Sequence, residues 1–290
     1  MKEVNIVNNV NNVYNEIVDF LFRTNAIEVC EPGKPFFYTS GKLGPYYINT
    51  HYLYGSKQDA QALLDIMDKN SQDHDVLNKL VTDSVMKQYN ENIIFKSVIT
   101  KLAEVASEYS FDLISGGERR DFFFSIPVAS ILGVPHLSIF KDGSTIYEGD
   151  VPLGKTCLHI ADLVTEASSY IRAWIPVVND LKVDMKYSLS VVDRNQGGNK
   201  VLCDAGIMFK ALAVIEDSFF ETAFRNGYIN REQLVMITNF MKDPQKFMLD
   251  FFRSDPGFLE RQIEAGGKSR ERALRCIEYG YNLPVEGSNA

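Results

Sequence analysis

The sequence predicts an α/β fold in which a mostly parallel sheet is flanked by helices. From residue 111 onward, short apolar runs of strand length alternate with helical patterns, which is typical of parallel sheets. Polar or glycine-containing segments follow several of these runs, as expected where strands end at a ligand-binding edge. Hydrophobic residues make up 45% of the 290 residues, which is enough for a substantial core.

Charge and cysteine content limit the possible function classes. The net charge of −8 argues against a nucleic-acid-binding protein, which usually carries a basic face. The four cysteines are scattered without the paired spacing of a zinc site or a disulfide framework. The N-terminus is rich in Asn rather than resembling a signal peptide, and no apolar run has membrane-spanning length. We therefore expect a cytoplasmic, reducing location and neither nucleic-acid nor membrane partners.

The N-terminal part predicts a helix followed by a hairpin. Apolar residues recur at helical spacing over residues 4–24, and residues 27–29 form a short strand pattern. Two aromatic segments within residues 36–49 flank a Thr-Ser-Gly-Lys turn, which predicts a β-hairpin. Its aromatic side chains could contact a flat ring, with hydroxyl groups and a Lys at the tip. Equally, they could belong to the core or to a dimer interface.

Helical patterns fill residues 56–110, and the polar stretch 68–75 between two of them predicts a solvated loop. His74 lies in this stretch and is expected to be exposed and inert. The α/β part then predicts a polar loop at 141–152 and strands at 111–115, 135–140, 157–160, 188–192, 201–205 and 211–214. We expect the segments after four of these strands to meet at one edge of the sheet, namely those containing Gly116, Lys141, Asp162 and Arg194.

The segment 154–169 is the strongest candidate for a binding site. An apolar strand ends on Asp162, and the loop after it contains Thr165, Ala167, Ser168 and Ser169 before a helical pattern begins. Free amides at a helix N-terminus favour a phosphate, and an acid after a strand can accept hydrogen bonds from sugar hydroxyls. Many parallel strands also end on Asp with no ligand, so the structural interpretation stays open.

A second candidate follows the strand at 111–115. Gly116 and Gly117 would let the backbone approach an anion, and Arg119 and Arg120 add positive charge there. The alternative is an ordinary turn with surface arginines. Residues 216–280 return to helical patterns. We therefore predict one domain over 1–235, with a helix and hairpin hood at 1–55, and a helical C-terminal extension at 236–290.

Four segments, taken in order, resemble the orotate phosphoribosyltransferases. They are Thr39–Asn49, Ile114–Asp121, Asp162–Ser169 and Asp193–Arg194, and the resemblance covers about residues 15–230. It implies a type I phosphoribosyltransferase fold and transfer of a phosphoribosyl group from phosphoribosyl pyrophosphate to orotate. It also implies Mg²⁺ held mainly by the substrate, and a homodimer.

The resemblance assigns roles to individual residues. Asp162 would bind a ribose hydroxyl and Lys141 would lie near the pyrophosphate, and these two are the implied catalytic residues. The loop 165–169 would hold the 5′-phosphate, and Arg194 with the Phe36 side of the hairpin would contact the base. The complete set of implied substrate-binding residues is Phe36, Phe37, Thr39, Ser40, Lys42, Gly116, Gly117, Arg119, Arg120, Thr165, Glu166, Ala167, Ser168, Ser169 and Arg194; no metal-ligating residue is implied.

The sequence departs from the family pattern at three places. Ala161 stands where the family has the first of two adjacent acids, and Glu166-Ala167 stands where it has a glycine. The segment 141–150 contains one base and three acids, whereas the family's mobile loop is basic. These departures motivate an alternative, a non-catalytic protein of this fold that binds a nucleotide or phosphoribosyl ligand as a sensor. A different nucleotide-binding α/β enzyme is disfavoured because neither glycine-rich phosphate-binding motif is present.

Overall fold

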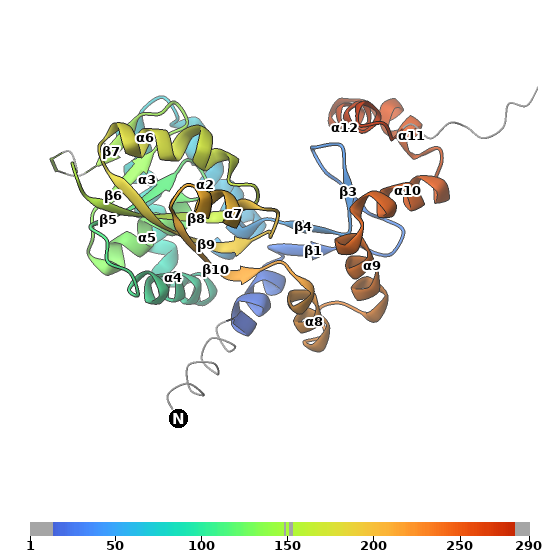
Figure 1. The fold of residues 1–290 in the computed structure, drawn as a ribbon, viewed down its shortest axis with the longest axis horizontal. Helices are drawn as coiled ribbons and strands as arrows, with labels where there is room; N and C mark the ends of the chain where they lie inside the picture. Colours follow the sequence, from blue (N-terminus) through green and yellow to red (C-terminus); the bar gives the residue numbers. More distant parts are fainter. Residues whose placement is uncertain (1–13, 148, 151–152, 282–290) are drawn as a thin grey trace, which may run out of the picture. The chain divides into compact units, whose positions relative to one another are not determined.

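The computed structural model describes residues 14–147, 149–150 and 153–281, which form two compact units (Figure 1). The first unit combines the chain up to Ala26 with Asn49–Thr222. The second combines Ile27–Ile48 with the chain from Ala223 onward. Residues 14–23 are helical, as predicted, whereas the first part of the predicted helix at 4–24 lies outside the described residues.

The first unit is built on a six-stranded sheet. Its strand order is β10-β9-β8-β5-β6-β7, and every neighbouring pair is parallel except β6 and β7. The bounds are β5 (Leu113–Gly117), β6 (His136–Ile139), β7 (Thr145–Tyr147), β8 (Thr156–Val164), β9 (Asp184–Asp193) and β10 (Met208–Val214). This arrangement confirms the predicted mostly parallel sheet.

Helices flank the sheet on both faces. The predicted helical region 56–110 forms α2 (Lys57–Lys69), α3 (His74–Glu91) and α4 (Ile93–Ala106). Ser56, Asp73 and Asn92 cap these three helices, each by accepting a backbone N–H hydrogen bond from the first helical turn. The other helical elements of this unit are η1 (Thr50–Tyr54), α5 (Phe122–Leu132), η2 (Tyr170–Trp174), α6 (Ile175–Asp180) and α7 (Gly198–Asp204), and α8 (Asp217–Arg225) follows β10.

Alternation along β5 and β8 separates the two faces. Cys157 and Ala161 of β8 pack in one buried cluster with Trp174 and Leu202, from the η2 and α7 side. On the opposite face, the Cβ that an alanine at position 116 would carry points at Ser125 of α5. Both faces are therefore covered, as expected for a largely parallel sheet.

Two local predictions were wrong. Residues 201–205 are not a strand, because Gly198–Asp204 form α7, which makes the crossover that a parallel β9–β10 pair requires. The loop predicted at 141–152 contains β7, since the turn after Phe140 brings Thr145 back beside Ile139. A short apolar run does not distinguish strand from helix by periodicity alone.

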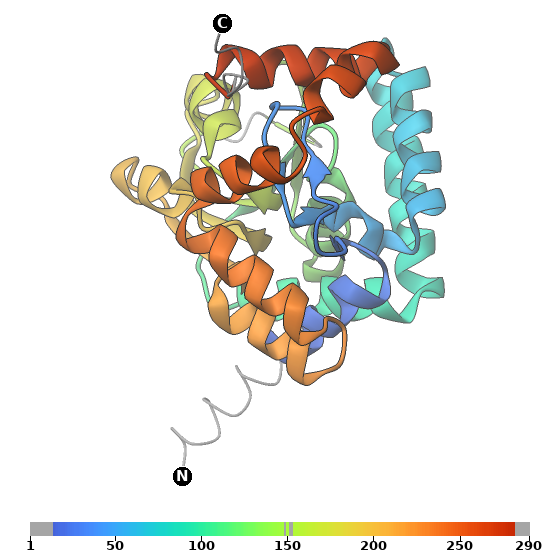
Figure 2. The ribbon, with the colours of Figure 1, turned by 90° about the vertical axis from the view of Figure 1, so that its right-hand side faces the viewer.

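In its described residues, the second unit contains two small sheets and four complete helices. β1 (Ile27–Val29) pairs with β4 (Tyr46–Ile48), which confirms the strand at 27–29. β2 (Phe36–Phe37) pairs with β3 (Leu43–Gly44), so a hairpin forms at the predicted turn, but the second aromatic segment belongs to β4 and pairs with β1 instead of β2. Figure 2 shows this hairpin, in blue, among the helices α9 (Arg231–Lys242), α10 (Pro244–Ser254), α11 (Phe258–Ala265) and α12 (Gly267–Glu278). No helix in the described ranges is both long and apolar enough to cross a membrane.

A small apolar core joins the hairpin to these helices. Leu43 packs with Met248, Phe252 and Cys276. Gly41 has a φ of +82°, and a Cβ there would lie 2.8 Å from the backbone nitrogen of Cys276. The hairpin tip therefore needs glycine both for its backbone conformation and for its close packing on α12.

Candidate functional site

A pocket of about 330 Å³ lies at the carboxyl ends of β5 and β8. It contains three segments that the sequence analysis singled out separately. Its lining residues are Glu118, Arg119, Arg120, Asp121, Lys141, Ala161, Asp162, Leu163, Val164, Thr165, Glu166, Ala167, Ser168, Ser169, Tyr170 and Trp174. The segments that contain Arg119, Lys141 and Asp162 therefore meet at one edge of the sheet, as predicted.

Asp162 is a buried carboxyl group in this pocket. It lies within β8 rather than after it, because pairing with β9 continues to Val164. The Thr50 hydroxyl donates a hydrogen bond of 2.8 Å to its Oδ2. Burial, followed by the nearby charge of Asp121, raises the pKa of Asp162 to about 7, although Arg120 and the Thr50 hydrogen bond oppose this shift. Its charge therefore changes near neutral pH.

The two arginines of the pocket have different surroundings. Arg119 pairs with Asp68 of α2, whose Oδ2 accepts a hydrogen bond of 2.5 Å from Nη1. The charge of Arg120 acts on the Asp162 carboxyl group. Burial, followed by the charge of Arg120, lowers the pKa of His51 to about 3. His51 is therefore neutral, and its buried Nδ1 has no hydrogen-bond partner among the described residues.

Releasing Arg119 from Asp68 should strengthen anion binding in the pocket. In Asp68→Asn, an anion no longer has to displace the carboxylate, and the Kd for inorganic pyrophosphate with Mg²⁺ should fall by about fivefold, which corresponds to about 1 kcal/mol. Titration calorimetry measures this change. Asp65→Asn, on the same helix, is the matched control and should leave the Kd unchanged. An unchanged or higher Kd in Asp68→Asn would show that Arg119 does not meet the anion.

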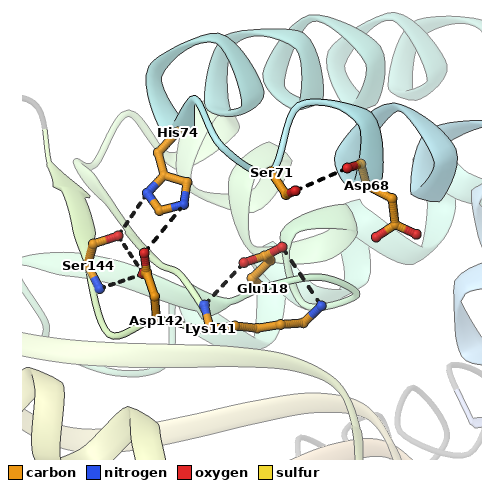
Figure 3. A network of polar contacts seen from close by, with 7 residues as sticks. All are labelled: Asp68, Ser71, His74, Glu118, Lys141, Asp142 and Ser144. Carbon is orange, nitrogen blue, oxygen red and sulfur yellow. Dashed lines mark hydrogen bonds and ion pairs between the residues drawn. The ribbon is translucent and has the colours of Figure 1, made fainter.

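Lys141 and Glu118 form one end of a polar network (Figure 3). The Lys141 amide donates to Glu118 Oε2 at 3.1 Å, and the Lys141 ammonium lies 3.9 Å from Oε1. Because more than half of the Lys141 side chain is exposed, this pairing leaves the ammonium available to a ligand.

His74 is not the inert loop residue that the sequence predicted. It is the first residue of α3, and its ring stacks on Phe140 with centroids 3.9 Å apart. Its Nδ1 lies 2.8 Å from the Ser144 hydroxyl, and its Nε2 lies 3.8 Å from Asp142 (Figure 3). The imidazole therefore anchors the turn that follows Phe140 to helix α3. The prediction failed because this contact joins segments about 70 residues apart.

The segment 165–169 runs from the end of β8 into the helical stretch that begins at Ser168. Among the described residues, the amides of Glu166, Ala167 and Ser168 donate to no backbone or side-chain group. Ala167 has a φ of +53°, which is the left-handed region where a Cβ is disfavoured. The loop thus presents free amides in a conformation that glycine would adopt more easily.

Ala167→Gly should stabilise the protein by about 0.5–1 kcal/mol, because glycine carries no Cβ penalty at this φ. The free energy of unfolding from urea titration measures the gain. Ala161→Gly, in the neighbouring strand β8, is the matched control and should destabilise instead. A loss of stability in Ala167→Gly would mean that packing of the buried methyl group outweighs the backbone penalty.

Gly116 and Gly117 do not line the pocket. Both lie in β5 and are fully surrounded by protein. A Cβ at Gly116 would lie 2.1 Å from Ser125 Oγ, and one at Gly117 would lie 2.3 Å from Trp174 Cζ2. Close side-chain packing therefore accounts for both glycines without a ligand.

The remaining predicted residues lie outside this pocket. The Arg194 amide donates to the Val164 carbonyl at 2.8 Å, while its buried Nε lacks a hydrogen-bond partner in the described ranges. In the second unit, the Phe37 ring contacts Phe258, and the Phe36 ring contacts Tyr47. The Thr39 carbonyl accepts from Arg275 at 2.6 Å, and Lys42 lies 6.0 Å from the centre of the Tyr279 ring, whereas Ser40 is exposed.

Two residues that contact Asp162 were not predicted from the sequence. Thr50 donates to its carboxylate, and Asp121 accepts the Asp162 amide hydrogen at 3.0 Å. Asp121 is the last residue of the segment Ile114–Asp121, so the sequence placed it near the site. Its contact with Asp162 could not be predicted. Thr50 follows the hairpin and carried no signal of its own.

Comparison with known proteins supports the fold and the resemblance. No family model matches the chain. The orotate phosphoribosyltransferase of Thermoplasma volcanium is 29% identical over 124 residues, covering 40% of this chain and 74% of the relative. UMP synthase of Leishmania donovani matches with a TM-score of 0.58 and 17% identity, over 79% of this chain. Orotate phosphoribosyltransferase of Francisella tularensis matches with a TM-score of 0.54 and 13% identity, over 78% of this chain and 96% of its own.

These likenesses confirm the predicted type I phosphoribosyltransferase fold and the resemblance to the orotate phosphoribosyltransferases. The match spans only 42% of the length of the UMP synthase.

Proposed function

We propose that this protein is an orotate phosphoribosyltransferase-like enzyme, which transfers a phosphoribosyl group from phosphoribosyl pyrophosphate to orotate in pyrimidine nucleotide synthesis. The observation that carries the proposal is the pocket that brings Asp162, the loop 165–169, two arginines and Lys141 to one edge of the sheet. The T. volcanium relative, named as an orotate phosphoribosyltransferase, supports orotate as the acceptor.

In this mechanism the chain positions the substrate and stabilises charge. The free amides and the hydroxyl groups of Thr165, Ser168 and Ser169 hold the 5′-phosphate. Asp162 accepts a hydrogen bond from a ribose hydroxyl. The bond between ribose C1 and the pyrophosphate oxygen breaks and pyrophosphate leaves with the electron pair. A ring nitrogen of orotate, deprotonated with loss of its proton to water, forms the new bond to C1. Arg119, Arg120 and Lys141 are the cations that face the leaving pyrophosphate.

The carboxylate of Asp162 has a second role, because the transition state carries positive charge on the ribose. An ionised carboxylate in a buried site stabilises such charge more strongly than it would in water. Since the pKa of Asp162 is raised to about 7, the fraction of active enzyme should increase as the pH rises through this value.

We propose Mg²⁺ as the cofactor, bound mainly to pyrophosphate oxygens and water, as this ion prefers. The described residues contain no group of three or more His, Cys, Asp or Glu side chains that could hold a metal ion. We therefore assign no residue of the chain to the ion, whose contribution is to neutralise charge on the pyrophosphate.

The orotate site is proposed from the family resemblance. Arg194 would pair with the orotate carboxylate. A homodimer and a cytoplasmic location are proposed on the same resemblance. Sedimentation velocity tests the dimer, which requires a species of twice the 32.8 kDa chain mass.

Calorimetric titration with phosphoribosyl pyrophosphate and Mg²⁺, followed by addition of orotate, tests the function. We expect saturable binding and then release of pyrophosphate, measured by a coupled phosphate assay. Binding without release would instead support the sensor that Ala161 and Glu166 suggest. Absence of binding would show that the fold is kept without its ligand. Uracil in place of orotate is the control for the acceptor.

A further inference from the structure

We infer that Asp121 is a positioning residue of this site, which supplies the carboxylate that position 161 lacks and controls the protonation state of Asp162. The inference rests on the proposed function for its catalytic consequence, but its structural part concerns only the described residues of the first unit. Neither the family resemblance nor the comparisons assign a role to Asp121.

Asp121 lies in the wall of the pocket, close to Asp162. It directly precedes α5 and is 9% exposed in the wall of the pocket. Its Oδ1 lies 3.0 Å from the amide nitrogen of Asp162, which is the amide immediately after Ala161. A carboxylate therefore stands beside the two positions where the family has adjacent acids, although it comes from a different element of the fold.

Two backbone amides hold the Asp121 carboxylate in place. The Gly117 amide donates to Asp121 Oδ2 at 3.2 Å, and the Asp162 amide donates to Oδ1. His159, a fully buried residue of β8, places its Nε2 3.6 Å from Oδ2. The Asp121 side chain is therefore fixed by groups of β5 and β8, with its carboxylate beside Asp162.

Buried polar groups of β5 and β8 lie behind Asp121. The Cys157 thiol donates to the Ser115 hydroxyl at 3.0 Å, and Ser115 Oγ lies 2.9 Å from His159 Nδ1. His159 Nε2 has no hydrogen-bond partner among the described residues, and it lies 3.6 Å from Asp121 Oδ2. A buried row of polar side chains thus leads from Cys157 to Asp121 in the wall of the pocket.

The Asp162 carboxyl group has donors of its own, which include the Leu163 backbone. Thr50 donates to its carboxylate, Arg120 is the nearby cation, and neutral His51 lies beside Thr50. Buried Tyr170 of η2 is also close to both acids and stays protonated, because burial raises its pKa well above the usual value. Burial is the largest cause that raises the pKa of Asp162, and the nearby charge of Asp121 is the second.

Asp121→Asn tests this coupling directly. The variant keeps the size of the side chain and an acceptor for the Asp162 amide but removes the charge. Using protein with ¹³C-labelled aspartate and no substrate, we expect the titration midpoint of the Asp162 carboxyl group to fall by about one pH unit or more. Asp162→Asn assigns the resonance. Asp204→Asn, an exposed acid of α7 paired with Lys200, is the control and should leave the midpoint unchanged.

An unchanged Asp162 midpoint in folded Asp121→Asn would overturn the inference. If that variant fails to fold, the wild-type protein still decides, because the inference requires one aspartate carboxyl group to titrate above about pH 6. If no aspartate carboxyl group titrates above about pH 6, the inference is also overturned. These titrations need no turnover, so they remain decisive even if orotate is not the acceptor.

The enzymatic readout separates a positioning role from a purely structural one. If the proposed function holds, the acidic limb of the pH profile of kcat/KM should move to lower pH in Asp121→Asn by the same amount as the carboxyl midpoint. A uniform loss of activity with an unmoved limb would contradict control of Asp162 by Asp121. Melting temperatures recorded at each pH confirm that the folded state is compared throughout.

Discussion

Asp162→Asn should abolish most phosphoribosyl transfer and yet make the folded protein more stable above pH 7. The amide keeps the shape of the side chain but cannot carry the negative charge that a cation-like ribose needs. We expect kcat/KM to fall by about 100-fold or more, as for removal of one electrostatic group in comparable sites. Measurement of pyrophosphate release at pH 8 checks this loss.

The stability change follows from the raised pKa of Asp162. In the unfolded chain this carboxyl group ionises near its usual value of 3.8, whereas in the folded protein it ionises at about 7. A raised folded-state pKa contributes stability that is complete below the lower value and is lost as the pH rises through the higher one. Above pH 7, the folded wild-type protein therefore carries a buried, unfavourable charge beside Asp121.

Asp162→Asn removes that cost at high pH only. Its free energy of unfolding should exceed that of the wild type by about 2 kcal/mol at pH 8, and the difference should shrink toward pH 5. Urea titration at the two pH values measures it, with Asp204→Asn as a control that should show no pH-dependent difference. A variant that is inactive but equally destabilised at both pH values would indicate a structural defect, and the loss of activity could then not be assigned to charge.

These opposite effects bear on the two proposed functions. A sensor needs only to bind its ligand. An acid such as Asp162, whose charge destabilises the folded protein above pH 7, would give a sensor little advantage. An enzyme with a cation-like transition state benefits directly from such a charge, and active sites commonly retain groups that cost stability. Turnover that depends on Asp162 would therefore exclude the sensor. Partial recovery of turnover in an Asp162 variant, by a carboxylate placed elsewhere in the pocket, would exclude it too.

The sequence predicted those parts of the molecule that depend on local pattern. The alternation of apolar runs and helices gave the sheet, and the strand, acid and loop at 154–169 formed one wall of the pocket. The error at residues 201–205 has the same origin, because four or five apolar and polar residues fit a short strand as well as a turn of helix.

Long-range contacts could not be predicted in this way. Thr50 reaches Asp162 across 112 residues, and Asp68 reaches Arg119 across 51. Neither pair has a spacing rule, because each depends on how separate elements pack. The glycines after β5 show the same limit. Their sequence suggested backbone approach to an anion, whereas the structure shows Ser125 and Trp174 in the space where a Cβ would lie.

Gly117→Ala should therefore damage the protein through packing. The added methyl group would lie 2.3–2.9 Å from three atoms of the Trp174 ring, which is 7% exposed and cannot move freely. We expect a loss of about 3 kcal/mol in the free energy of unfolding, because overpacking a rigid core forces side chains off their preferred rotamers. Gly257→Ala is the matched control, since its added methyl group meets only the flexible end of Arg261.

A second substitution in the same contact identifies the cause. Trp174→Phe shortens the ring at the atoms that the new methyl group would meet, so the double variant should be more stable than the sum of the two single losses predicts, by about 1 kcal/mol or more. Simple additivity would mean that Gly117 is needed for its backbone or for a ligand rather than for Trp174.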